Sequence, residues 1–225
     1  HHQEFLDLVR AAEEQSGNPV AVLLDLGGPK MRLGELPGGQ FTCKQGDTVR
    51  FVRGEVAMHP GELVSTYPTL IDELRPGDRI MLADGIVALN VTEVTAEAAI
   101  CEVRQGGMVR DRQGVNLPGV KLTAPALSER DRASAIWGAG AGADFISLSF
   151  VRRPDDVQQL RDVLNDIGST ARIIAKIEKP EALECLDEIV DAADGIMVAR
   201  GDLGVEVDIA EIAAEEPERV LRRAV

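Results

Sequence analysis

Aromatic side chains are scarce in this chain of 225 residues: they make up 3% of it, with one Trp and one Tyr. Hydrophobic residues as a whole make up 44%, so the core has to be built from Val, Leu, Ile and Ala. Such a core suits buried parallel strands covered by helices better than an aromatic-rich β-sandwich.

Cysteine is also scarce, and the three cysteines (Cys43, Cys101 and Cys185) are far apart in the sequence. Their odd number and wide spacing exclude a disulfide framework and a structural zinc site. No run of residues approaches the roughly 18–20 apolar residues of a membrane span. No basic segment followed by an apolar run opens the chain, so no secretion signal is expected. We therefore expect a cytoplasmic protein that does not enter a membrane.

Positive charge is in deficit: 24 Lys and Arg residues face 38 Asp and Glu residues, for a net charge of −14. Nucleic acids and anionic membranes attract basic surfaces, so neither is an expected partner. A small anionic substrate would have to be held by local cations or by a metal ion, because the overall field repels it.

The hydrophobic pattern divides the chain into three segments. Residues 1–33 pair a helix with the apolar run of residues 20–26, which predicts a strand buried on both faces. Residues 34–117 hold short β-like runs between Gly and Pro turns, which predicts a small all-β domain. Residues 118–225 alternate helix and strand, as parallel strands with outer helices do. The all-β domain is thus expected as an insertion into an α/β domain.

The expected elements of the third segment can be placed by residue. Strands are predicted over residues 143–150, 171–177 and 194–199. Helices are predicted over residues 128–139, with Ser128 as the cap, over residues 154–167 and over residues 180–190. Functional groups collect at the carboxyl ends of such strands. Each predicted strand, like the one over residues 20–26, is followed directly by polar or charged side chains.

Lys176 and Glu178 are two residues apart at a strand end, so their side chains point the same way. A surface ion pair explains this spacing as well as a functional site does. Asp202, between two glycines after the next strand, favours the functional interpretation. Glu178 and Asp202 would together suit a hard cation such as Mg²⁺. The amides of Gly201 and Asp202 would offer donors to an anion if they begin a helical turn, although an ordinary turn is the alternative.

Two further residues follow the strand over residues 20–26. Asp25 ends that strand, where an unpaired carboxylate is costly, so it should face a cation or a cleft. Arg32 lies where the chain enters the β domain, and either binds a phosphate bidentately or is a solvated hinge residue. The residues alone thus predict a metal-assisted site for a small anion. Lys176 is its catalytic cation, and a β domain hinges over it.

The chain resembles pyruvate kinases in five stretches, which occur in the family's order and together span nearly the whole sequence. They are LLDLGGPKMRLG (23–34), GVNLPG (114–119), SLSFVRRPDDV (147–157), AKIEKPEAL (175–183) and DGIMVARGDLGVEV (194–207). The resemblance implies a TIM (β/α)₈ barrel of which this chain holds strands three to six. It also implies a small β-barrel lid domain inserted after the third strand.

The resemblance also implies a reaction, which is transfer of the phosphoryl group of phosphoenolpyruvate to ADP to give pyruvate and ATP in glycolysis. By motif, Glu178 and Asp202 match the ligands of Mg²⁺ or Mn²⁺. Lys176 matches the lysine that stabilises the transferring phosphoryl group. Gly201 and Asp202 match the backbone clamp on the substrate carboxylate, and Arg32 matches the arginine that binds the nucleotide phosphates.

Two departures from the family pattern bear on cations. Potassium-dependent members usually carry Thr, Glu and Thr where this chain has Leu26, Lys30 and Leu33. Asp25 matches the aspartate that helps to hold the monovalent cation, and the ammonium of Lys30 can replace that ion, so potassium is not expected to be required. Gln113 stands where a lysine commonly precedes GVNLPG, which weakens the expected contact of the lid with the nucleotide.

The family pattern places further catalytic residues outside this chain. Activity is therefore expected of the longer parent protein, a homo-oligomer and by resemblance a tetramer, and not of the fragment alone. Two alternatives remain. One is a Mg²⁺-dependent aldolase or lyase of the phosphoenolpyruvate/pyruvate barrel group. The other is a catalytically silent, pyruvate-kinase-like binding or regulatory protein.

Overall fold

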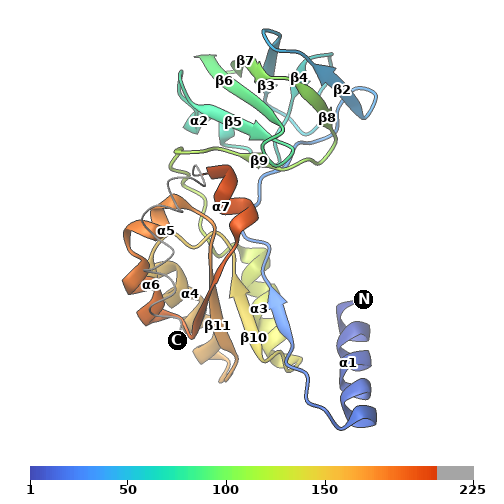
Figure 1. Ribbon diagram of the computed structural model, residues 1–225, viewed down its shortest axis with the longest axis vertical. Helices are drawn as coiled ribbons and strands as arrows, with labels where there is room; N and C mark the ends of the chain where they lie inside the picture. The colour runs from blue at the N-terminus through green and yellow to red at the C-terminus, as the bar shows by residue number, and fades with distance from the viewer. Residues whose placement is uncertain (207–225) are drawn as a thin grey trace. The chain divides into compact units, whose positions relative to one another are not determined.

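The computed structural model describes residues 1–206, which divide into two compact units (Figure 1). The first unit combines His1–Pro29 with Pro125–Ala199. The second holds Lys30–Ala124 and, of the described residues, the helix α7 (Arg200–Glu206). The inserted segment expected from the sequence, residues 34–117, lies within the second unit. In residues 1–206, no helix is both long enough and apolar enough to cross a membrane.

The first unit is built on a four-stranded, entirely parallel sheet. Its strands are β1 (Leu23–Asp25), β10 (Phe145–Leu148), β11 (Arg172–Ile177) and β12 (Gly195–Val198), in that spatial order. The order follows the chain, and helical connections join β10 to β11 and β11 to β12. This arrangement confirms the predicted α/β class and is that of a partial TIM barrel.

Five helices belong to the described part of this unit. They are α1 (His2–Ser16), α3 (Glu129–Gly140), α4 (Pro154–Asp166), α5 (Pro180–Glu184) and α6 (Leu186–Ala192). Helix α3 packs on β10 and α4, and α4 packs on β11 and α6. Helix α3 starts with the capping box of Ser128 and Asp131, which satisfies two free amides of its first turn.

Two sequence-based predictions in this unit are wrong in detail. One helix was expected over residues 180–190, but the chain leaves the helical conformation at Cys185 (φ −128°, ψ 38°), so α5 and α6 are separate. The strand over residues 20–26 was expected to be buried on both faces, but β1 is shorter and Leu23 is 40% exposed. In the described residues β1 pairs with β10 alone, so its other edge has no neighbour.

The second unit is almost entirely β-structure (Figure 1). One sheet has six strands in the order β4-β3-β7-β6-β5-β9, and β2 pairs with β8 in a second sheet. The bounds are β2 (Gln40–Cys43), β3 (Thr48–Val52), β4 (Glu62–Leu63), β5 (Arg79–Leu82), β6 (Val87–Val94), β7 (Ala98–Gln105), β8 (Gly107–Arg110) and β9 (Val115–Asn116). Between residues 30 and 124 the helix is the single turn α2 (Leu70–Glu73). The short runs predicted from the sequence therefore do form strands.

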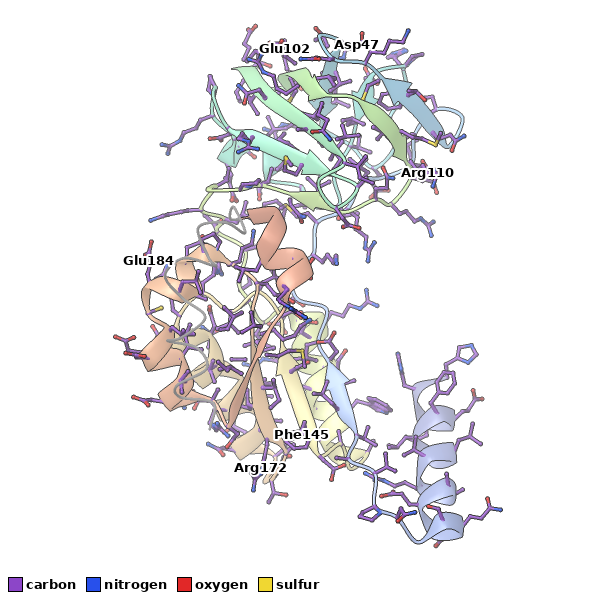
Figure 2. All side chains as sticks on the ribbon, viewed as in Figure 1. Asp47, Glu102, Arg110, Phe145, Arg172 and Glu184 are labelled. Carbon is purple, nitrogen blue, oxygen red and sulfur yellow. The ribbon has the colours of Figure 1, made fainter. Side chains whose placement is uncertain are left out.

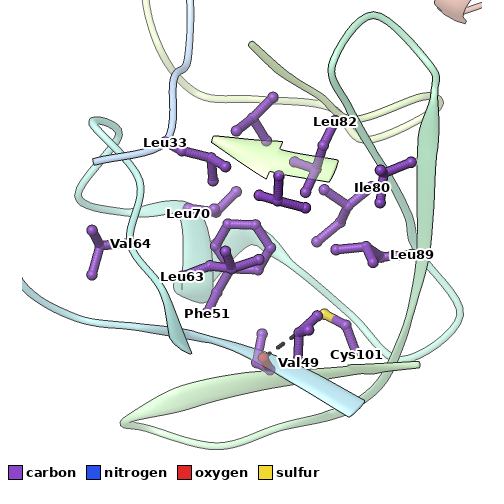
Figure 3. Close-up of a cluster of buried hydrophobic side chains, with 14 of the residues drawn as sticks. Leu33, Val49, Phe51, Leu63, Val64, Leu70, Ile80, Leu82, Leu89 and Cys101 are labelled. Carbon is purple, nitrogen blue, oxygen red and sulfur yellow. Dashed lines mark hydrogen bonds between the residues drawn. The ribbon is translucent and has the colours of Figure 1, made fainter. Parts of the chain in front are cut away.

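The core of the second unit is aliphatic, as the composition predicts (Figure 3). Leu33, Leu63 and Ile80 are 0% exposed, and they surround Phe51, which is 1% exposed. Residues Asp84 and Gly85 lie in the turn of the β5–β6 hairpin, where both have positive φ angles. An Asp-Gly pair is typical of such tight hairpin turns.

Candidate active site

Lys176 stands on the face of β11 opposite to its fully buried face. Ile173, Ala175 and Ile177 are 0% exposed and share one face of the strand. Because side chains alternate along a strand, Lys176 points to the other face, which in a closed barrel is the interior. Its side chain is 14% exposed. Strand β11 thus places the largely buried ammonium group of Lys176 near the carboxyl ends of the parallel strands.

The ammonium group of Lys176 is held by three side chains from three strand ends. Nζ lies 2.9 Å from Oε1 of Glu178 and 3.2 Å from Oδ1 of Asp25. It also donates a hydrogen bond of 2.9 Å to Oγ of Ser149. The predicted proximity of Lys176 and Glu178 is therefore present in the structure. Asp25 also faces a cation, as predicted, but its side chain is 57% exposed, so the predicted reason, the cost of burying an unpaired carboxylate, does not apply.

Burial lowers the pKa of Lys176, but the hydrogen bonds and negative charges of Glu178 and Asp25 raise it. The net result is a pKa above the ordinary value for lysine. Lys176 is therefore protonated at neutral pH. The site thus holds a protonated ammonium group between the carboxylates of Glu178 and Asp25 at the end of the parallel strands.

Glu178 is buried, with its side chain 1% exposed, and it uses both oxygens. Oε1 faces Lys176, and Oε2 accepts a hydrogen bond of 2.9 Å from the amide of Phe150. Phe150 has a φ of 57°, which is unusual for a residue other than Gly. Gly28 packs against this bend, since a Cβ on it would lie 2.8 Å from Cδ2 of Phe150. The loop after β10 is thus shaped to turn an amide toward Glu178.

The ends of β1 and β10 are linked by two serines that the sequence analysis did not single out. Ser147 donates a hydrogen bond of 2.6 Å to Oδ1 of Asp25, its partner in the β1–β10 register. Ser149 donates one of 2.7 Å to the carbonyl of Leu26. Both serines are nearly fully buried, at 0% and 2% exposure. Their signal in the sequence is two polar residues at a spacing of two, at the end of an apolar run.

The amino ends of the same parallel strands lie opposite to the ends that carry Lys176 and Glu178. Phe145 and Arg172, labelled in Figure 2, begin β10 and β11 and pair in register. In barrels of this type the amino ends of the strands serve stability and the carboxyl ends serve chemistry. The Lys176 cluster lies at the carboxyl ends.

Four of the predicted site residues lie in the second unit: Lys30, Arg32, Gly201 and Asp202. Lys30 is 3.8 Å from Oδ1 of Asp202, with the two side chains 40% and 35% exposed. Arg32 is exposed and donates from Nη1 to the carbonyl of Arg112 at 3.1 Å. The two carboxylates that are predicted to bind the metal ion thus belong to different units, Glu178 to the first and Asp202 to the second.

Gly201 and Asp202 lie in the first turn of α7, which begins at Arg200. The amides of a first helical turn have no acceptor within the helix, so they are open to an anion. The helical turn that the sequence analysis made a condition for an anion site is therefore present. Among the described residues, no three His, Cys, Asp or Glu side chains form a group able to hold a metal.

The parallel strands, the outer helices and the charged cluster at the carboxyl ends of the strands define part of a β/α barrel protein. Comparison with known proteins gives the family. Residues 1–222 match the family described as pyruvate kinase, barrel domain, and the chain belongs to the pyruvate kinase family.

Several curated relatives carry the name pyruvate kinase. That of Corynebacterium efficiens is 43% identical over 211 residues, which cover 94% of this chain and 44% of the relative. That of Mycobacterium tuberculosis is 43% identical over 211 residues, covering 94% and 45%. That of Geobacillus stearothermophilus is 42% identical over 214 residues, covering 94% and 36%. The chain thus spans less than half the length of these relatives.

Proposed function

We propose that the parent protein of this chain transfers the phosphoryl group of phosphoenolpyruvate to ADP, giving pyruvate and ATP. The observation that carries the proposal is the cation of Lys176, fixed at the carboxyl edge of the sheet by Glu178, Ser149 and Asp25. Phosphoryl transfer depends on positioning and on neutralising charge more than on covalent chemistry. A lysine held rigidly by its neighbours needs no reorganisation to stabilise the transferring group.

A divalent cation, Mg²⁺ or Mn²⁺, belongs to this proposal, with Glu178 and Asp202 as its protein ligands. The donor chemistry fits, because Mg²⁺ in such sites is commonly bound through one or two carboxylates plus water and substrate oxygens. A group of three protein ligands is therefore not required. When bound, the ion neutralises charge on the phosphoryl oxygens and on the enolate. Lys176 would then exchange part of its contact with Glu178 for contact with the phosphoryl group.

The remaining contacts of the substrates are assigned by chemistry. The first-turn amides of Gly201 and Asp202 suit the carboxylate of phosphoenolpyruvate. Arg32 suits the phosphates of ADP, because a guanidinium binds phosphate oxygens bidentately. The β-rich segment 34–117 would act as a lid whose closure excludes water that otherwise captures the phosphoryl group.

We propose further that the enzyme works without potassium. Asp25 is the carboxylate that would share a monovalent cation, and it already faces the ammonium of Lys176. Lys30 has its own carboxylate partner in Asp202, at 3.8 Å. In this proposal the ammonium of Lys30 supplies the charge that a mobile cation supplies in potassium-dependent members of the family.

We propose further that the parent protein is cytoplasmic and forms a homo-oligomer. The three cysteines are free thiols, and two of them are buried, which suits a reducing compartment. The net charge of −14 disfavours nucleic acids and anionic membranes as partners. The tetramer expected from the family resemblance would be checked by the mass of the parent protein in solution.

The test is turnover by the parent protein with phosphoenolpyruvate, ADP and Mg²⁺, compared between wild type and Lys176→Met. We expect turnover to fall by at least about 10²–10³-fold, the usual loss when a group that stabilises the transition state is removed. The matched control is Lys44→Met, which removes an exposed lysine of the second unit and should change nothing.

The outcomes separate the candidate functions. Wild-type turnover that collapses only in Lys176→Met supports the kinase. Metal and phosphoenolpyruvate binding without turnover would replace it with the silent binding protein. Cleavage or formation of a carbon–carbon bond, with no phosphoryl transfer to ADP, would replace it with the aldolase or lyase.

A further inference from the structure

The hydroxyl of Ser149 connects Lys176 to the chain that continues from β1. It donates its proton to the carbonyl of Leu26 at 2.7 Å, and its oxygen accepts a hydrogen bond of 2.9 Å from Nζ of Lys176. A serine hydroxyl has one proton, so the proton that Leu26 holds cannot also point at the ammonium. The hydroxyl therefore has one orientation, in which its oxygen faces Lys176.

The carbonyl that accepts this proton is itself held by strand pairing. The amide of Leu26 donates to the carbonyl of Ser147 at 3.0 Å, which continues the β1–β10 pairing by one residue beyond Asp25. Leu26 is 1% exposed and Ser149 is 2% exposed. Ser149 is thus a short, buried link from the backbone of two paired strands to the ammonium group of Lys176.

The three contacts of this ammonium group differ in charge. Glu178 and Asp25 are carboxylates, at 2.9 Å and 3.2 Å, whereas Ser149 is neutral. A lysine ammonium has three N–H donors, so all of them are used while these contacts are made. An anion that binds Lys176 must therefore displace at least one contact. It repels the two carboxylates, and it does not repel a hydroxyl.

The two carboxylates also lose less than Ser149 does when the ammonium turns away. Asp25 is 57% exposed, so water can solvate it. Glu178, as a proposed ligand of the divalent cation, would gain that ion as a partner. Ser149 would keep a buried oxygen without this donor, and a buried polar atom that loses its partner is costly.

We propose that Ser149 is a positioning residue whose hydroxyl keeps the ammonium of Lys176 in place when an anionic ligand draws it from Glu178 and Asp25. The inference rests on the proposed function insofar as that function supplies the anion, which is the phosphoryl group of phosphoenolpyruvate. The retained contact aims the other donors of Lys176 at the ligand. Misplacing such a group by about 1 Å can lower the rate by about a hundredfold, so this aim matters for turnover.

The experiment measures kcat and the Kd for phosphoenolpyruvate of the parent protein and its variants, the Kd by calorimetry. A crystal structure of wild type with phosphoenolpyruvate and Mg²⁺ locates Nζ of Lys176 in the complex. Ser149→Ala removes one oxygen, and Ser149→Thr retains the hydroxyl. The control is Ser134→Ala, which removes a hydroxyl that donates to the carbonyl of Arg130 at 2.9 Å in helix α3.

We expect Ser149→Ala to lower kcat by at least about tenfold, the effect of losing a hydrogen bond to a charged group, and to change the Kd by a smaller factor. Ser149→Thr should recover part of the loss, and Ser134→Ala should match wild type. Added to Lys176→Met, Ser149→Ala should change kcat by a smaller factor than in wild type, because Ser149 acts through Lys176. A merely structural role would make the two losses multiply.

Three results would overturn the inference. They are an active enzyme whose kcat is unchanged in Ser149→Ala, an equal factor of loss in the Lys176→Met background, and a phosphoenolpyruvate complex in which Nζ has left Oγ of Ser149. A wild type that binds no phosphoenolpyruvate would overturn the inference together with the proposed function. A wild type that binds it with this contact retained, but transfers no phosphoryl group to ADP, would support the inference and overturn the kinase activity alone.

Discussion

Lys176 and Glu178 form an ion pair of 2.9 Å in which the carboxylate is 1% exposed and the ammonium 14% exposed. A carboxylate this deeply buried depends on its partner, because removing one member of a buried pair leaves an uncompensated charge. The pair therefore has a structural role in the first unit in addition to any catalytic one.

Lys176→Met should lower the free energy of unfolding by about 3 kcal/mol, since the charge of Glu178 stays buried without its main partner. Urea unfolding of the parent protein with EDTA measures this, because a bound divalent ion would replace the lost cation. The double variant Lys176→Met/Glu178→Gln removes both charges and should recover most of the loss. Equal unfolding midpoints for the single variant and wild type would contradict the buried pair.

Added K⁺ should not raise phosphoryl transfer by the parent protein if, as proposed, the ammonium of Lys30 takes the part of the monovalent cation. The assay compares KCl with tetramethylammonium chloride at one ionic strength, so that screening is the same in both. Lys30→Glu restores a carboxylate at that position and should make turnover depend on K⁺. A strong stimulation of wild type by K⁺ would refute potassium independence.

Gly28→Ala should destabilise the first unit and weaken catalysis. Gly28 has a φ of 63°, and an added Cβ would lie 2.8 Å from Phe150 and 3.1 Å from Ser149, which contacts Lys176. The matched control is Gly168→Ala, where φ is 66° and no atom lies within 4 Å of the added Cβ.

The control should cost about 1–2 kcal/mol from backbone strain alone. Gly28→Ala should cost more, and it alone should lower turnover. Thermal unfolding and turnover of the two variants, measured side by side, check this. Equal losses in both would mean that Phe150 and Ser149 move aside without consequence.

Glu73 anchors the segment that leaves the second unit. It accepts hydrogen bonds from the hydroxyls of Tyr67, Thr69 and Thr123, and from the amide of Thr123. Burial raises the pKa of this carboxyl, but these hydrogen bonds outweigh it and hold the pKa below the ordinary value of 4.5. The carboxylate form therefore stabilises the fold.

Because the folded pKa is depressed, the stability from Glu73 is present above the unfolded pKa and is lost as the pH falls through the folded value. Glu73→Gln should cost about 1–3 kcal/mol at pH 7 and progressively less below pH 4.5. Unfolding midpoints between pH 3 and pH 7 measure this. Glu93→Gln, at an exposed site, should match wild type throughout; a Glu73→Gln loss independent of pH would contradict the argument.

Much of the fold follows from local patterns. The short strands of the second unit, the aliphatic core and the alternation of strand and helix after residue 125 all reflect periodicity within single segments. The spacing of Lys176 and Glu178 likewise predicts that both side chains point the same way. The break between helices α5 and α6 at Cys185 could not be predicted from the sequence, because residues 180–190 carry a helical pattern without a Gly or an internal Pro.

The partners of the site residues did not follow from local patterns either. Ser147 and Ser149 could be recognised only once the β1–β10 register was known, because each bonds to a residue more than a hundred positions away in the chain. The left-handed backbone of Arg112 (φ 60°) could not be predicted from the sequence either, since nothing in its side chain favours that conformation.

The sequence by itself determined the class of the protein, its family and the kinds of side chain at each strand end. These depend on composition, periodicity and motif, which are local properties. Only the tertiary structure decided that Lys176 takes Asp25, 151 positions away, as a partner, and that Arg32 meets Arg112. Such contacts depend on which strands and turns lie side by side, and strand pairing is set by packing across the whole unit.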